Sequence, residues 1–305
     1  MDAIEKRILE EVADIHEVPE GAYNIRSNGK LSGRNTTADI NIVTKEDKQG
    51  IDIIIAPNTK KQSVHIPVII SETGLKDLVY NDFYVGENAD VTIVAGCGIH
   101  NCGDQDSSHE GIHTFHLAKN ARVKYIEKHY GEGDGNGQNI MNPKTVFFLE
   151  EGAYMEMETT QIKGIDSTVR DTEGTLKADA TLIIHEKLMT HGSQYAKTNF
   201  SVELNGENSS ANVVSRSVAK ENSKQEFVSR IIGNNRCNGH SECDAIIMDN
   251  AVVTAVPELT AANIDASLIH EAAIGKIAGE QLTKLMTLGL TEEEAEEQIV
   301  NGFLK

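Results

Sequence analysis

Two cysteines and a histidine stand close together in the stretch RCNGHSECD, at residues 236–244. Cys237, His240 and Cys243 offer the thiolate and imidazole ligands that bind zinc or iron in proteins. Three such ligands are one short of a closed structural zinc site. The pair Asn238-Gly239 favours a turn, which argues against a helix and interrupts the alternation of a strand. The residues of this stretch therefore predict a turn, and they fit a sulfur- or metal-handling site and a pair of buried thiols equally well.

A second candidate follows in HEAAIGKI, at residues 270–277. His270 lies 27 residues after Cys243, close to one coil of the repeat described below, so the two side chains are expected on neighbouring rungs. Glu271 would point to the other face of a strand. A histidine and a carboxylate beside a thiol can lower its pKa or complete a metal's ligand set. The alternative is a strand end whose polar residues simply meet water.

Two further segments contain reactive side chains or many glycines. The segment CGIHNCGDQDSSHEGIHTFH, at 97–116, holds Cys97, Cys102 and several histidines. Its glycines and its place between strands predict a polar loop, and a dedicated metal site is the alternative. The segment GEGDGNG, at 131–137, lacks the Lys-Ser/Thr pair that completes a phosphate-binding loop. It is predicted to be a flexible loop.

Most of the elements that position these residues are predicted to be short strands. From about residue 35 to residue 270, runs with period two such as IDIIIA, ADVTIV and ARVKYIE predict strands. Ala89, Ala121 and Ala153 each follow a short turn and are spaced by 32 residues. A repeating unit of turn and strand predicts a β-solenoid core over residues 30–275, in which neighbouring coils bury one another. A two-sheet sandwich is the alternative.

Helices are predicted at both ends of the chain. Within residues 1–20, apolar residues recur at helical spacing before Pro19-Glu20-Gly21 (Ile4, Ile8, Leu9, Val12 and Ile15). Residues 276–305 are predicted to form two short helices. Gly289 would follow the end of the first, and Thr291 with Glu294 would form a capping box at the second. Their apolar stripes either cap the solenoid or dock a partner.

Composition narrows the function classes. The 305 residues are 39% hydrophobic, which is adequate for a core, and the net charge of −19 would repel phosphate backbones and anionic lipid. Nucleic-acid binding is therefore not expected. The N-terminus does not resemble a signal peptide, and no segment reaches the apolar length of a membrane span. We expect a cytoplasmic protein without membrane association, whose four cysteines stay reduced.

Several motifs in one order resemble the C-terminal half of the SufB/SufD proteins, the scaffold components of the SUF iron–sulfur cluster assembly machinery. They are GHSECD (239–244), HEAAIGKI (270–277), EQLTKLMTLGLTEEEA (280–295) and NGF (301–303). Upstream, GCGIHN and GIHTFHLAKNARVKYIEKHYGEG look like the compact archaeal or clostridial type of SufB-like protein, so the resemblance covers most of the chain. It implies a mainly β fold, a right-handed parallel β-helix followed by a C-terminal helical pair.

The resemblance also implies site residues. Cys243 matches the family's cysteine implicated in sulfur transfer and nascent cluster assembly, and Glu271 and His270 match residues of the same site. These three are expected to hold a transient iron–sulfur cluster, with Cys237 and His240 as auxiliary residues. The long N-terminal helical region of larger SufB proteins is reduced here to about 20 residues.

The resemblance implies partners as well. They are a second copy of the chain, joined through the β-helix with the cluster at the interface, and a SufC-type ABC ATPase bound by residues 276–305. A sulfur donor and apo-protein acceptors complete the set. The chain is then a scaffold and not an enzyme. The alternatives are a β-solenoid enzyme acting on a carbohydrate or acyl substrate, and a structural subunit with zinc in the segment 97–116.

Overall fold

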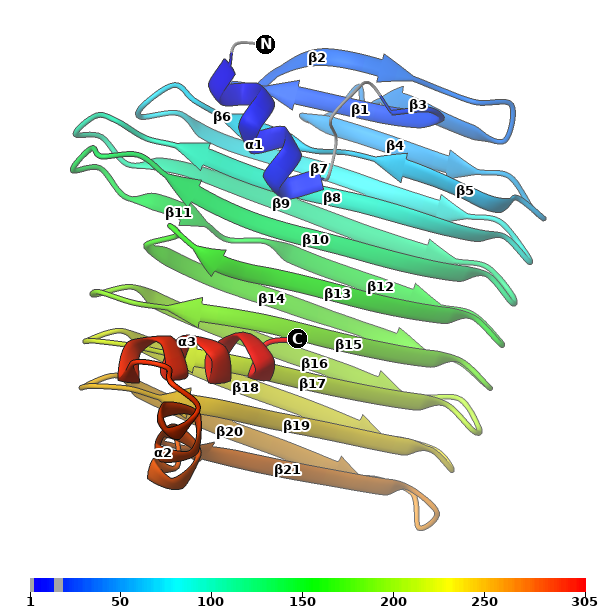
Figure 1. Ribbon diagram of the computed structural model, residues 1–305. Helices are drawn as coiled ribbons and strands as arrows, with labels where there is room; N and C mark the ends of the chain where they lie inside the picture. Colours follow the sequence, from blue (N-terminus) through cyan, green and yellow to red (C-terminus); the bar gives the residue numbers. More distant parts are fainter. Residues whose placement is uncertain (1–2, 14–18) are drawn as a thin grey trace.

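The structure, a computed structural model that describes residues 3–13 and 19–305, confirms a mainly β fold built as a solenoid (Figure 1). Along the chain, single strands or pairs of consecutive strands pass from one to the other of two long sheets, here called sheet A and sheet B, that face each other across the core. In the described residues, only β1–β2 and β3–β4 pair antiparallel, and all other ladders are parallel. The coiled connectivity excludes the two-sheet sandwich.

The strands of each sheet stack in the order of the coils. Sheet A contains, within the described residues, β2 (Lys30–Asn35), β1 (Ala22–Ser27), β5 (Lys60–His65), β6 (Val68–Ile70), β8 (Asp90–His100), β10 (Arg122–Glu132), β13 (Tyr154–Lys163), β15 (Thr181–Thr190), β17 (Ser210–Ala219), β19 (Asn238–Ile247) and β21 (Ser267–Gly275). Sheet B contains, over the same part of the chain, β3 (Ile40–Thr44), β4 (Gly50–Ile55), β7 (Lys76–Val85), β9 (Ser107–Leu117), β11 (Asn139–Met141), β12 (Lys144–Leu149), β14 (Ser167–Leu176), β16 (Tyr195–Leu204), β18 (Lys224–Gly233) and β20 (Val252–Ala261).

The alanine repeat seen in the sequence marks the turn that enters sheet A. Ala89, Ala121 and Ala153 are fully buried and stand directly before β8, β10 and β13. The residue before the first two is an asparagine with φ of 56°, a left-handed conformation that asparagine tolerates. Ala180 and Cys237 occupy the same position before β15 and β19, and both are buried. Cys237 therefore fills the place of a small packing residue in the repeat.

Two segments that were predicted as turn or loop are mostly strand, with the predicted turn at residues 236–237 and the predicted loop at residues 101–106. Residues 238–244 of RCNGHSECD belong to β19, and the turn lies before them, at 234–237. In the segment 97–116, residues 97–100 end β8 and residues 107–116 belong to β9. Parallel neighbours on both sides supply backbone hydrogen bonds, which outweighs the weak strand preference of glycine and asparagine. The glycine-rich segment 131–137 leaves β10 at Glu132 and forms a turn.

The N-terminal helix α1 (Ala3–Ala13) packs on sheet A over β6, β8 and β10 (Figure 1). Its buried face includes Ile8, Leu9 and Val12, as the helical spacing predicted, while Ile15 lies outside the described residues. Two glycines of β8 admit the helix, because a Cβ added at Gly98 would lie 2.0 Å from Ile8 Cγ2. Close packing on α1 thus accounts for glycines in the middle of a sheet.

The C-terminal helices α2 (Gly279–Thr287) and α3 (Glu292–Phe303) have the predicted end signals. Gly289 has φ of +101° just after α2, and Thr291 and Glu294 form the capping box of α3. Helix α3 lies on sheet A, with Val300 buried against the solenoid, whereas α2 has no buried residue. Among the helices of the described segments, none combines the length and apolar character needed to cross a membrane.

Candidate functional site

Cys243 and His270 share the inner face of the last two rungs of sheet A. Along β19 the side chains alternate, and Cys243 points inward with 1% of its surface exposed. The parallel register places Ser241 beside His270 and Cys243 beside Ala272. His270 is therefore a diagonal neighbour of Cys243, two residues along the ladder and on the same face. The end of the solenoid thus brings a thiol and an imidazole together.

Both groups are uncharged in this setting. Burial raises the pKa of the Cys243 thiol to about 12, and the negative charges of Glu186 and Asp244 add to the effect. Burial lowers the pKa of His270, and its Nδ1 atom is buried without a hydrogen-bond partner. A neutral imidazole with a free ring nitrogen can ligate a metal directly. The thiol must first lose its proton, which a bound metal ion promotes.

Cys243 ends a column of polar side chains that runs through the core. The parallel ladders place Glu127, Thr159, Glu186, Ser215 and Cys243 at matching inward positions of successive strands. The hydroxyl of Ser215 donates to Glu186 Oε2 at 2.6 Å, and the hydroxyl of Thr198 donates to Glu186 Oε1 at 2.7 Å. The interior beside Cys243 is therefore hydrogen-bonded and polar, in contrast to the apolar column that a solenoid core usually contains.

The opposite end of this polar interior contains a second buried thiol, Cys97 of β8. Burial alone would raise the pKa of Cys97, but the charges of His109 and His129 and their hydrogen bonds outweigh it and lower the pKa to about 7. His109 Nδ1 bonds with Asp77 Oδ2 at 3.0 Å. Although burial opposes it, interaction with Cys97 and Asp77 raises the pKa of His109 to about 10. Around neutral pH the Cys97 thiol therefore ionises beside a protonated His109.

A buried ion pair lies between the Cys97 end and the Cys243 end of the polar interior. Arg170 of β14 bonds with Glu127, which also accepts a hydrogen bond from Tyr125 at 3.0 Å. Sequence reasoning missed Glu127, Arg170 and Glu186, because charged residues in an alternating strand are normally assigned to the outer face. The signal was present: Val123, Tyr125, Glu127 and His129 keep strict period two in β10, and all four point inward.

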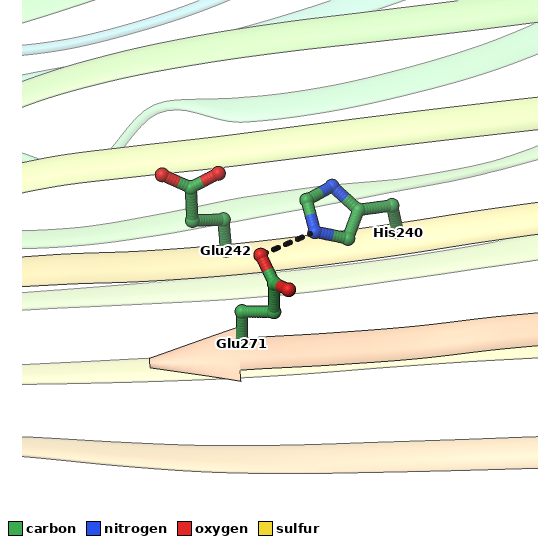
Figure 2. A group of neighbouring side chains, drawn as sticks. All are labelled: His240, Glu242 and Glu271. Atoms are coloured by element: carbon green, nitrogen blue, oxygen red, sulfur yellow. Dashed lines mark ion pairs between the residues drawn. The ribbon is translucent and has the colours of Figure 1, made fainter. Parts of the chain in front are cut away.

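The outer face of the same two rungs carries His240, Glu242 and Glu271 (Figure 2). Glu242 and Glu271 are directly paired across β19 and β21, and His240 lies two residues before Glu242 on the same face. One ligand atom from each of the three lies within 4.8 Å of the others. Burial and the neighbouring Asp244 raise the pKa of Glu242. The trio could hold a metal ion, and it stands on the opposite side of the sheet from Cys243.

The other predicted residues are dispersed. Cys237 is buried in the core directly before β19, in the same apolar cluster as Cys243, whereas Glu271 faces outward and does not lie with His270 on the inner face. Cys102 is exposed, with its Sγ atom 3.1 Å from His100 Nε2. His109 and His113 point into the core, whereas the ring of His116 stacks outside between Tyr84 and Phe148. Across residues 3–13 and 19–305, no three ligands from the segment 97–116 meet the spacing of the outer trio.

A family model and several related proteins that match this chain all describe iron–sulfur cluster assembly. Residues 79–303 match the family described as SUF system FeS cluster assembly, SufBD core domain. The chain is 30% identical to the iron–sulfur cluster assembly SufBD family protein MJ0034 of Methanocaldococcus jannaschii, over 80% of this chain and 77% of that protein. It is 31% identical to PH0883 of Pyrococcus horikoshii, a protein with the same family description, over 92% of this chain and 86% of the relative. Identity to the iron–sulfur cluster assembly protein SufB of Bacillus subtilis is 29%, over 72% of this chain and 47% of SufB.

Proposed function

Because this chain belongs to the SufBD family of iron–sulfur cluster assembly proteins, we propose that it is a scaffold on which a nascent cluster is built. Beyond family membership, the proposal rests on one observation: a thiol and a neutral imidazole share the inner face of the last two rungs. Thiolate and imidazole are both iron ligands. The cluster is the cargo, supplied with sulfur by a donor and passed to apo-proteins, so the chain acts as a scaffold and not as an enzyme.

We assign the inner part of the assembly site to Cys243 and His270. Glu271, which family resemblance implies for the same site, points to the opposite face of β21. Within one chain, it cannot share an iron atom with Cys243 while the strand keeps this register. A cluster held by Cys243 therefore takes its further ligands from His270, from exogenous sulfide or from a second subunit.

The last coil supports a homodimer. Among residues 3–13 and 19–305, strands β20 and β21 each have a strand neighbour on one side only, and they expose apolar side chains such as Val256, Leu259 and Ile269. An open strand edge with apolar residues favours pairing with another chain. Two copies joined end to end about a two-fold axis would bring the two Cys243–His270 pairs close together. The dimer would then present ligands from both subunits to one cluster.

Helix α2 supports docking of the ATPase. None of its residues is buried, and Met286 and Leu288 at its C-terminal end are 43% and 76% exposed. The apolar side of helix α3, by contrast, packs on the solenoid through Val300 and through Leu304, the residue after the helix. The exposed apolar surface of α2 is thus available to a partner, and we propose a SufC-type ABC ATPase there. Replacement of Leu288 by Glu should weaken that complex about thirtyfold, as loss of a 2 kcal/mol contact would.

The control for docking is Leu31→Glu, which changes an exposed leucine at the other end of the solenoid. It should bind the ATPase like the wild type. Equal binding by Leu288→Glu and the wild type would place the docking surface elsewhere.

The dimer is tested by sedimentation. The Leu259→Glu, Ile269→Glu double variant should be a monomer, and Val43→Glu, which changes an exposed apolar residue at the far end of the solenoid, is the control. A dimeric double variant would contradict the end-to-end arrangement.

The assembly site is tested by anaerobic reconstitution with iron and sulfide, followed by visible absorption of the cluster. Cys243→Ser should abolish the absorption without unfolding the protein, because the hydroxyl is close in size but a poor ligand for iron. Cys102→Ser is the matched control, since its thiol is exposed and lies far along the chain from β19. Normal reconstitution by Cys243→Ser would exclude this cysteine as the assembly residue.

A further inference from the structure

We propose that His240, Glu242 and Glu271 form a loading site for a single ferrous ion on the outer face of β19 and β21. The choice of iron rests on the proposed function, whereas the choice of a divalent metal rests on the ligands alone. The three side chains come from two neighbouring strands and need no loop to bring them together; His240 and Glu271 point toward each other, and Glu242 stands beside them with its carboxylate turned away (Figure 2). This site is separate from the inner face, where Cys243 and His270 lie.

The geometry suits one metal ion. His240 Nε2 lies 3.4 Å from Glu271 Oε2, close to the roughly 3 Å between adjacent ligands of a metal with bonds of about 2.1 Å. An oxygen of Glu242 lies within 4.8 Å of both atoms, so a side-chain rotation would bring it into the same shell. Glu242 and Glu271 are also directly opposite in the ladder, where two carboxylates repel. A bound cation would remove that repulsion.

The neighbouring strand orients the histidine as a metal ligand. His240 Nδ1 makes a 2.8 Å hydrogen bond with Asn212 Oδ1 on β17. Because the amide oxygen can only accept, Nδ1 carries the hydrogen, and in the neutral tautomer the lone pair of Nε2 is directed at Glu271. A lone pair and a carboxylate oxygen need a cation between them, either a proton or a metal ion. A second hydrogen bond that fixes the tautomer of a histidine is the usual support of a metal-binding imidazole.

The ligand types of the outer trio limit which metal ions it can bind. One imidazole and two carboxylates suit Fe²⁺, Mn²⁺, Co²⁺ or Zn²⁺ but lack the thiolates that hold a cluster. The side chains of His240 and Glu271 are 31% and 67% exposed, so the ion could enter and leave from solvent. Three protein ligands leave further coordination positions open. The outer trio therefore fits an exchangeable ion that waits beside the assembly site on the other side of the same strands.

Metal binding is measured first, on the full chain before any cluster is formed. Co²⁺, which is spectroscopically visible and takes the same ligands as Fe²⁺, should bind the Cys243→Ser variant with visible bands and no thiolate charge transfer, and the same bands should appear in the wild type. Glu242→Gln and His240→Gln should lose this binding. Asn212→Ala should weaken it by about 10–100-fold, the usual cost of removing a supporting hydrogen bond.

The matched control is Glu203→Gln, the same chemical change at an exposed position of β16 on sheet B, and it should bind Co²⁺ like the wild type. Two results would overturn the site: retention of Co²⁺ by Glu242→Gln, or wild-type protein that binds none, in which case the trio is only an ion pair between His240 and Glu271. Loss of binding in Cys243→Ser would move the ion to the inner face.

The link to cluster assembly is measured separately. At limiting Fe²⁺, Glu242→Gln should form cluster more slowly than the wild type, and excess Fe²⁺ should restore the rate. Cys243→Ser should not be rescued by excess Fe²⁺. If the wild type binds Co²⁺ but assembles no cluster, the proposed function fails and the metal site stands. If Glu242→Gln assembles cluster normally at limiting Fe²⁺, the trio does not load iron.

Discussion

Two of the three buried thiols, Cys97 and Cys243, differ in charge although both point inward from sheet A. Their exposed fractions are 4% and 1%. The pKa of Cys97 is lowered to about 7, because two imidazoles outweigh the effect of burial. The pKa of Cys243 is raised to about 12, because burial is reinforced by two carboxylates. Burial by itself therefore does not set the state of a thiol, and the charges around it do.

This difference separates two kinds of chemistry. Cys97 is a thiolate near neutral pH without any added ion, held by an internal network of charges. Cys243 has no positive partner on its inner face, since His270 is neutral. A metal ion would supply the missing positive charge and displace the proton from the thiol. The site near Cys243 is thus poised for an incoming cation, whereas the Cys97 network is already complete.

The largest expected effect comes from breaking the charge network. Arg170→Leu removes the guanidinium that pairs with Glu127 and leaves this buried carboxylate with only the His129 ring, 3.5 Å away, as a positive partner, so the free energy of unfolding should fall by about 3–5 kcal/mol. Equilibrium unfolding in urea measures the change. Arg230→Leu is the control, because its ion pair with Glu258 is exposed and should contribute less than about 1 kcal/mol. Similar losses in both variants would show that the buried network is not what stabilises the Cys97 end.

The next effect tests the protonated state of Cys243. In a variant that keeps only this cysteine, the affinity for Cd²⁺ should rise about tenfold per pH unit through the neutral range, because each binding event releases the thiol proton. The sign follows from a pKa of about 12, which lies above that range. The thiolate-to-cadmium absorption band reports binding. An affinity independent of pH would mean that the thiol is already ionised.

A third effect concerns how pH changes stability at the Cys97 end. The pKa of Cys97 falls on folding, so its contribution is present above pH 9.0 and is lost as the pH falls through about 7. The pKa of His109 rises, so its contribution is present below pH 6.5 and is lost as the pH rises through about 10. Between about pH 7 and pH 9, the contribution of Cys97 to the free energy of unfolding rises with pH while that of His109 falls. The free energy of unfolding of the wild type should therefore change little over this range.

Cys97→Ala removes the contribution of Cys97 to the pH dependence of the free energy of unfolding and leaves that of His109. The free energy of unfolding of this variant should decline as the pH rises above 6.5, because His109 keeps Asp77 as its partner but loses the thiolate. Urea unfolding at several pH values measures the slope. Cys237→Ala is the control, since burial raises the pKa of that thiol and its position matches the alanines of the repeat. Parallel profiles for both variants would refute the thiolate–imidazolium pair.

The smallest effect is expected beside Cys243. The hydroxyl of Ser241 donates to Ser229 across the core at 2.8 Å. Ser241→Ala should cost about 1 kcal/mol, the net value of a neutral hydrogen bond, because no charge is left unpaired. Urea unfolding against the wild type is sufficient. A loss as large as that of Arg170→Leu would mean that the two ends of the core are stabilised alike.

The repeat and its end signals could be predicted from local patterns. Strand alternation and the buried alanines at 32-residue spacing depend on neighbours in sequence and on a turn that recurs, so they predicted the solenoid. The capping box at Thr291 and the glycine after α2 are likewise local. The distance of one coil between Cys243 and His270 followed from the same period. Each of these features needs only short-range geometry.

The tertiary structure alone decided which side chains are paired inside the core. The period of β10 marks Glu127 as an inward residue, but Glu127 and Arg170 are 43 residues apart and meet only because their coils are adjacent, so no local pattern could identify the pair. Residues 238–239 became a strand because parallel neighbours on both sides outweighed their preference for a turn. The same alternation placed Glu271 outside with His240 and kept Cys243 within. Long-range register, set by the stacking of coils, divided the candidate residues between the two faces of one sheet.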